Sequence, residues 1–224
     1  GAMQTVGEAG TITTIDYRLT PNQDPDEQWS LVRMSSAFQN PVVIIGVPTA
    51  FGPQSAVPRI RNLRYGGDSP NGAPCDGHCF EVRLQEPGCY DDVHMTETLS
   101  WLVIESGTWY ADDGKVIQTG RVHANGADSS YINTIGGGWH DVTYHLPFPD
   151  DNVAVLTQTQ TTIDREFVKT RQKPLRGVGL GTGFSVMLEG YSSLDDGTGC
   201  CSGQQLQNGG SGNFGDANHA TEHV

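Results

Sequence analysis

The chain has 224 residues, of which 26 are acidic and 13 basic, and its formal net charge is −13. This acidic balance disfavours nucleic acid as a partner, and no apolar run approaches the roughly 18 residues that a membrane helix needs, which excludes membrane insertion by a helix. Glycine (29 residues) together with an apolar fraction of 36% gives a globular composition, and the many glycines favour short strands and turns over helices.

Two runs of landmarks follow one another in the same order along the chain. Each run has a Glu-x-Gly-Thr start, a Trp-x-x-Val pair, a Phe-led apolar strand, a basic strand, a Phe-x-Val-x-Leu strand and a His-x-Thr-Glu motif. In that order, the paired segments are residues 8–11 and 105–108, 29–32 and 139–142, 38–43 and 148–155, 59–62 and 169–172, 80–84 and 184–188, and 94–97 and 219–222. Alternating apolar and polar side chains in these segments predict half-buried antiparallel strands.

The duplication predicts an all-β protein of two tandem units, residues 1–108 and 109–224, each a six-stranded antiparallel β-sandwich. The second unit carries a longer loop between its Phe-x-Val-x-Leu and His-x-Thr-Glu motifs. It stops at His223-Val224, before any counterpart of the apolar strand at residues 99–105. We expect the second unit to lack this last strand because the sequence is one strand short; another segment or a neighbouring molecule is the alternative source.

Five cysteines lie in two loop-like, glycine-rich stretches. They are Cys75, Cys79, Cys89, Cys200 and Cys201. Cys75 and Cys79 with His78 make only half of a zinc-binding pattern, so disulfides are the favoured interpretation. Disulfides indicate a secreted or cell-surface protein, and the odd count leaves one thiol free or paired elsewhere.

The Phe80-Glu-Val-Arg-Leu strand, a polar loop and then Ser100-Trp-Leu-Val-Ile-Glu105 resemble the H-type lectin domain, a six-stranded β-sandwich of snail and slime-mould agglutinins. The basic strand from Arg59 also fits. Related tandem copies ending in His-x-Thr-Glu look like modules of secreted microbial surface proteins and polysaccharide-active enzymes. The resemblance covers nearly all of the first unit, and the second unit shares it through the repeat.

The resemblance implies a sugar site between subunits of an oligomer, held by an arginine of the basic strand and a Trp-His pair after the Phe strand. The arginine position falls on Arg59, with Lys169 as its repeat partner, and the Trp-His position falls on Cys89-Tyr90. The candidate glycan-binding residues are Arg59, Arg61, Tyr90, Lys169 and Arg171. The alternative is that the strand cations pair with acids such as Glu81 or Glu86. Trp29, Trp101 and Trp139 are expected in the core.

His94 and Glu97, with Asp91 and Asp92 before them, could bind a metal such as calcium or act as an acid/base pair. Because the His-x-Thr-Glu motif occurs in both units, we favour a structural role, with the His and Thr side chains bonding a turn and the Glu preceding the buried strand. No further ligand is placed by the sequence, and no nucleophile motif occurs, so the chain is not expected to be an enzyme and needs no cofactor.

These observations predict an extracellular carbohydrate-binding or adhesion module whose partners are glycans or polysaccharide, with a homo-oligomer possible. The alternative function is a non-catalytic structural or assembly domain of a larger surface protein, without a sugar site.

Overall fold

The computed structural model describes residues 5–18, 28–36, 38–61, 78–86, 93–124, 139–160, 168–175, 179–190 and 222–223. These segments contain strands and no helix, which confirms the all-β expectation for this part of the chain. The strands are β1 (Gly7–Thr13), β2 (Tyr17–Arg18), β3 (Ser30–Arg33), β4 (Pro41–Ile45), β5 (Val57–Arg61), β6 (Cys79–Gln85), β7 (Val93–His94), β8 (Thr98–Glu105), β9 (Gly107–Tyr110), β10 (Val116–Thr119), β11 (His123–Ala124), β12 (His140–Thr143), β13 (Val168–Pro174), β14 (Gly183–Gly190) and β15 (Glu222–His223). Within these segments, no helix is long and apolar enough to cross a bilayer.

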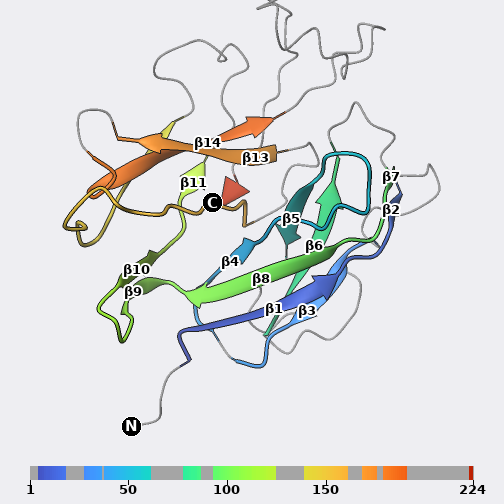
Figure 1. Cartoon of the computed structure of the whole chain (residues 1–224), viewed down its shortest axis with the longest axis horizontal. Coiled ribbons are helices and arrows are strands. Elements are labelled where there is room, and N and C mark those ends of the chain that lie inside the picture. Colours follow the sequence, from blue (N-terminus) through green and yellow to red (C-terminus); the bar gives the residue numbers. More distant parts are fainter. Residues whose placement is uncertain are drawn as a thin grey trace, which may run out of the picture.

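Two three-stranded antiparallel sheets enclose the core of the first half. One has the order β1-β8-β4 and the other β3-β6-β5 (Figure 1). The burial of β8 alternates along its length, because successive side chains of a strand point to opposite faces. The inner faces of both sheets supply one hydrophobic cluster, consisting of Val32, Met34, Phe38, Val43, Ile45, Ile60, Phe80, Val82, Leu84, Leu99, Trp101 and Val103. This face-to-face packing is typical of a β-sandwich.

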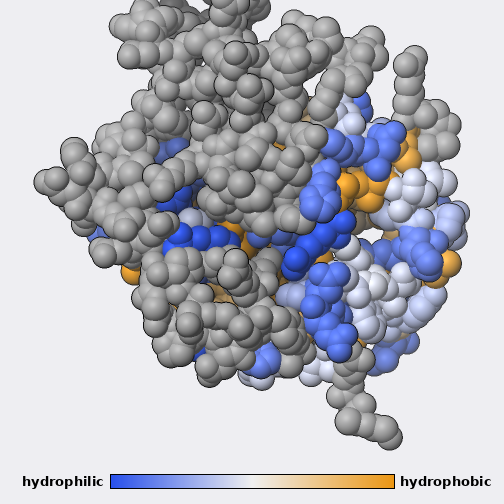
Figure 2. Space-filling view, turned by 180° about the vertical axis from the view of Figure 1, so that it is seen from behind, coloured by the Kyte–Doolittle hydropathy of each residue, from blue (hydrophilic) through white to orange (hydrophobic). Residues whose placement is uncertain are grey.

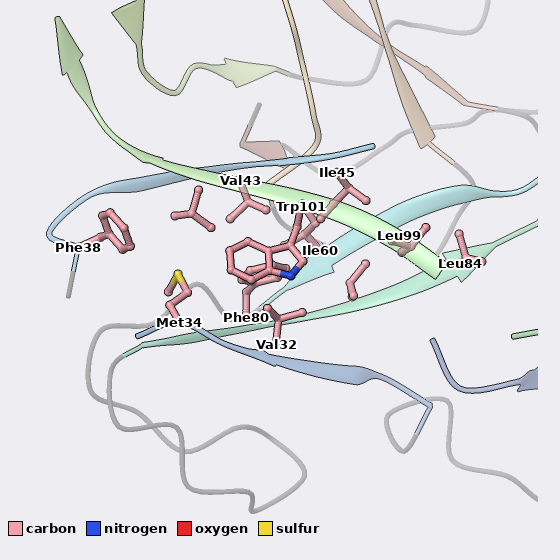
Figure 3. Packing of buried hydrophobic residues seen from close by; sticks show 12 residues of the cluster. Val32, Met34, Phe38, Val43, Ile45, Ile60, Phe80, Leu84, Leu99 and Trp101 are labelled. Atoms are coloured by element: carbon pink, nitrogen blue, oxygen red, sulfur yellow. The ribbon is translucent and has the colours of Figure 1, made fainter. Parts of the chain in front are cut away.

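Trp101 of β8 lies at the centre of this core (Figure 3). Its ring meets that of Phe80 edge to face, with 5.9 Å between the centroids. Across the ladder it pairs with Gly10 of β1, and a Cβ atom on Gly10 would come within 2.6 Å of the indole. The glycine therefore makes the room that the largest core side chain needs.

A sheet of the second half repeats the β3-β6-β5 sheet. Its order is β12-β14-β13, so the third of the three strands along the chain again lies in the middle. Val142 pairs with Phe184 as Val32 pairs with Phe80. The turns after the first strands also match, since the N–H of Met34 donates to the His78 carbonyl and that of Tyr144 to the Thr182 carbonyl. The repeat seen in the sequence is therefore present in this sheet.

The start of the second repeat differs from the expected one. The Glu8 carboxylate accepts the backbone N–H groups of Ser35 and Ser36, at 2.9 and 3.0 Å. In the second half Gln118, not Glu105, makes the corresponding contact, because its Oε1 accepts the N–H of Leu146 at 3.1 Å. Glu105 ends β8. The Glu-x-Gly-Thr match at residues 105–108 was therefore wrong, and the true counterpart of β1 begins near residue 117.

Side chains of the second half close the outer edge of β4. The Val43 N–H donates to Gln160 Oε1 at 2.8 Å, and Gln160 Nε2 donates back to the Val43 carbonyl at 2.7 Å. Arg121 donates to the Pro41 carbonyl at the start of β4. In the neighbouring sheet, Gln158 Nε2 donates to the carbonyl of Pro58 in β5 at 3.1 Å. Gln160 is 1% exposed, so its amide takes the place of a neighbouring strand. On the face in Figure 2, apolar surface of the coloured residues occurs only in small patches among hydrophilic ones.

Candidate functional site

The outer face of the β3-β6-β5 sheet carries the basic residues that the sequence singled out. Residues Arg59 and Arg61 of β5 pair across the ladder with Arg83 and Glu81 of β6. Because Phe80, Val82 and Leu84 alternate with them, these polar side chains lie on the face away from the core. Arg59 is fully buried and its Nη1 donates to Gln85 Oε1 at 3.0 Å.

Arg61 forms the ion pair that the structural alternative predicted. Its Nε lies 2.7 Å from Glu81 Oε2, and the side chain is 12% exposed. The guanidinium also stacks on Trp29, with 4.3 Å from Cζ to the ring centroid, and Arg83 approaches the same ring at 4.6 Å. Cation–π contacts of this kind are strongest when they are desolvated. In the first half, this face is thus filled by its own side chains.

Trp29 is buried, but it belongs to this outer face and not to the hydrophobic core cluster, which contains Trp101 alone of the three tryptophans that we expected there. The sequence pattern could not separate the two environments, because both tryptophans occur in or next to segments with the alternation of a strand. Tyr90, the proposed stacking residue of the first unit, lies outside the described residues.

The second half keeps the cation–tryptophan pair. Lys173 Nζ lies 4.0 Å from the centroid of the Trp139 ring, as Arg61 lies over Trp29. The register gives the reason: Arg171 pairs with Met187 as Arg59 pairs with Arg83, and Lys173 follows two residues later on the same face. The repeat partner of Arg59 is therefore Arg171 and not Lys169, which pairs further along with Glu189.

The two copies of this face differ in exposure. Trp139 is half-buried, whereas Trp29 is only 6% exposed, and Lys169, Arg171 and Lys173 are all exposed. Met187 stands where the first half has Arg83, so at this position the Trp139 ring has no counterpart of the second cation that approaches Trp29. Sequence reasoning assigned Trp139 to the core; the signal it missed is the replacement of Arg83 by an uncharged residue.

A second cluster joins His94 to two carboxylates. His94 Nδ1 lies 2.8 Å from Glu86 Oε1, and its Nε2 lies 3.6 Å from Glu97 Oε1. All three side chains are buried, with exposures of 3% or less. Glu86, which the sequence suggested only as a partner for the strand cations, is the second carboxylate beside His94. It directly follows β6 and lies eight residues before His94, but no motif spacing pointed to their contact.

Glu97 is bonded to the turn at residues 49–52. Its carboxylate accepts the Thr49 hydroxyl and the N–H groups of Phe51 and Gly52, the latter at 2.7 Å. Burial by itself raises the pKa of Glu97, but these hydrogen bonds and the nearby His94 outweigh it and hold the pKa below its usual value. A Cβ atom on Gly52 would come within 2.8 Å of the His94 ring, so the turn packs directly against the imidazole.

His94 and Glu97 of this cluster line a pocket of about 170 Å³, together with the turn residues Thr49 and Gly52 and with Pro48, Ala50, Gln54 and Ala56. Every Glu97 oxygen is already bonded to the protein, and the described residues contain no group of three or more ligands arranged for a metal ion. These bonds fit a structural role for Glu97, but it is the Glu97 carboxylate that bonds the turn, where the His and Thr side chains of the motif were expected to do so. Asp91 and Asp92 lie outside the described residues.

Only one of the five cysteines is described. Cys79 begins β6, is buried and is disulfide-bonded. Cys75, Cys89, Cys200 and Cys201 lie outside the described residues.

No protein-family model matches the chain, and no solved structure matches it. Among curated proteins, the chain is similar to halomucin of Haloquadratum walsbyi (strain DSM 16790 / HBSQ001), with 26% identity over 170 residues. The match covers 72% of this chain and 2% of halomucin. The chain therefore spans a very small part of the length of this relative.

Proposed function

We propose that the chain is a carbohydrate-binding or adhesion module of a secreted or cell-surface protein, built from two tandem H-type lectin-like sandwiches. The observation that carries the binding function is the half-buried Trp139, which shares an exposed sheet face with Arg171 and Lys173. An aromatic ring offers a face for the C–H groups of a sugar, and guanidinium and ammonium groups donate to hydroxyl or carboxylate oxygens.

The similarity to a short part of halomucin supports a module within a long extracellular protein, because the name describes a mucin. The shared strand order of the β3-β6-β5 and β12-β14-β13 sheets supports the tandem arrangement. The second unit is the better candidate for the sugar site, since in the first unit Arg59 is fully buried and Arg61 is paired with Glu81.

A structural or assembly role without a sugar site is the second candidate. It is favoured by the first half, where the same cations stabilise the sheet and Trp29 is covered. In that case the exposed cations of β13 would contribute only solubility and weak surface pairing.

A glycan array probed with the labelled chain tests the proposal. We expect binding that falls at least tenfold in Trp139→Ala and Arg171→Ala, while Lys115→Ala, which removes an exposed cation from the turn between β9 and β10, binds as the wild type does. EDTA is expected to leave the signal unchanged; a loss would favour a calcium site that includes Asp91 and Asp92. A folded sample that binds no glycan would favour the structural role.

A further inference from the structure

The outer face of the β12-β14-β13 sheet, which we call the Trp139 face, differs in charge from its counterpart in the first half. In the first half Arg61 pairs across the ladder with Glu81, and the two side chains form an ion pair at 2.7 Å. The equivalent ladder pair of the second half is Lys173 and Ser185. The second half therefore keeps the cation and has a neutral side chain in place of the acid.

The sequence around β13 is basic, although the chain as a whole is acidic. Between Glu166 and Glu189 there is no Asp or Glu, and four of the 13 basic residues of the chain fall in this stretch. Three of the four are exposed and lie on one face of β13, namely Lys169, Arg171 and Lys173, which we call the cation row. Salt screens charges beyond about 10 Å at 0.1 M ionic strength, so the local charge decides which ligands approach this face.

Two acidic residues of the neighbouring strands stand at the ends of the cation row. Asp141 of β12 shares the ladder partner Ser185 with Lys173, and its Oδ1 accepts the Ser185 hydroxyl at 2.7 Å. At the other end of the row, Glu189 stands opposite Lys169 in the register. The middle of the row is thus the part of this face where positive charge is least offset by these two acids.

Trp139 adds an aromatic ring to this part of the face. The middle cation, Arg171, stands opposite the uncharged Met187, and Lys173 Nζ lies 4.0 Å from the centroid of the half-buried Trp139 ring. Cations on an edge strand also discourage pairing with other strands, but that role does not require an aromatic ring beside them. A ring next to cations suits a ligand that has both a C–H face and a negative charge.

We propose that the Trp139 face binds an anionic polysaccharide, whose sugars carry carboxylate or sulfate groups. This inference rests on the proposed carbohydrate-binding function and names its class of glycan. A sugar ring stacks on Trp139, and the planar guanidinium of Arg171 donates two parallel hydrogen bonds to the anionic group. Lys173 has a flexible stem, so its ammonium leaves the ring and pairs with a second anionic group. Successive cations of the row are about 6.7 Å apart along the strand, and they follow one line as the charges of a linear polymer do.

A glycan array with neutral, carboxylated and sulfated members, probed with the whole labelled chain, tests the class of ligand. We expect every strong signal to come from a charged glycan and to disappear when its carboxylates are reduced to alcohols or its sulfates are removed; these two treatments distinguish the two anions. Affinity is expected to fall at least tenfold between 0.1 and 1 M NaCl, because the screening length falls from about 10 to about 3 Å. Equally strong binding of neutral glycans that depends on Trp139 would leave the carbohydrate-binding function in place and overturn this inference. Binding of no glycan would overturn both.

Matched variants locate the charges that bind. Lys173→Gln removes one positive charge and is expected to weaken binding of the anionic glycan at least tenfold, whereas Lys115→Gln, on a side chain that is 79% exposed elsewhere, binds as the wild type does. Asp141→Asn keeps an oxygen for the Ser185 hydroxyl but removes a negative charge, so we expect about threefold tighter binding. An unchanged affinity in both Lys173→Gln and Asp141→Asn, with native unfolding midpoints, would refute the site.

Replacement of Trp139 separates a sugar site from charge attraction alone. The net charge of the chain is −13, so the molecule as a whole repels a polyanion. Trp139→Ala keeps the cation row and is expected to weaken binding at least tenfold, while Trp139→Phe keeps a ring for stacking and is expected to weaken it less than threefold. Undiminished binding by Trp139→Ala would show that charge alone holds the polymer and would overturn the proposal.

Discussion

Replacement of Glu97 probes whether the His-x-Thr-Glu motif stabilises the fold. The carboxylate is 1% exposed and accepts three hydrogen bonds, from Thr49, Phe51 and Gly52. Hydrogen bonds to charged groups contribute about 1.5–3 kcal/mol each, and relief of the buried charge offsets part of their sum. We therefore expect Glu97→Ala to lower the free energy of unfolding by about 3–5 kcal/mol. Glu97→Gln keeps one acceptor oxygen and is expected to cost about 2 kcal/mol.

Urea unfolding at pH 7, followed by tryptophan fluorescence, measures these differences. Because the fold lowers the pKa of Glu97 from its ordinary value of 4.5, its stabilisation is complete above that pH and is lost as the pH falls through the folded-state pKa. The difference between wild type and Glu97→Gln must therefore shrink in acid. Asp113→Asn, on an exposed turn, is the control and is expected to leave the unfolding midpoint unchanged. A Glu97→Gln difference that is constant from neutral to strongly acidic pH would refute the reasoning.

Three further predictions follow from the described contacts. Gln160→Ala leaves the N–H and C=O of Val43 without the amide and is expected to lower the free energy of unfolding by about 1–3 kcal/mol in urea titrations; an unchanged midpoint would contradict the edge-closing role. Leu99→Ala, at a fully buried position, is expected to cost about 2–5 kcal/mol, whereas the exposed Leu156→Ala changes stability by less than about 0.5 kcal/mol in the same assay. Burial raises the pKa of Glu8, but the N–H groups of Ser35 and Ser36 outweigh it and lower the pKa from 4.5. The stabilisation that Glu8 contributes is therefore also lost in acid, and Glu8→Gln should flatten the fall of stability below about pH 4.5. An equally steep fall would count against a stabilising contact between Glu8 and this turn.

Strand type was predictable because it depends on local alternation of apolar and polar residues. The order of the strands was not predicted: the Phe-x-Val-x-Leu segments form the central strands β6 and β14, with the Trp-x-x-Val strands beside them. Pairing register was less predictable, since a shift of two residues keeps the same face outward. The assignment of Lys169 as the partner of Arg59, in place of Arg171, was an error of this kind.

The site residues show a different limit of sequence reasoning. Trp29 and Trp101 each lie just before a Leu-Val pair in the sequence, yet one stacks on arginines and the other fills the core. Glu86 joins His94 only because β6 and β7 bring them together in space. Contacts between side chains at the ends of different strands depend on how the strands end and cross, even for residues only eight positions apart such as Glu86 and His94, and composition or spacing does not give this information.

The closure of β4 by Gln160 has a consequence for any attempt to divide the molecule. A first half produced without residues 139–160 would present Pro41–Ile45 as an uncovered edge, with the Val43 backbone groups in water. Such an edge is a template on which further strands, including those of identical molecules, can assemble. The second half thus protects this edge from pairing with the strands of other molecules. A fragment that ends after β8 is expected to aggregate under conditions in which the whole chain remains dispersed.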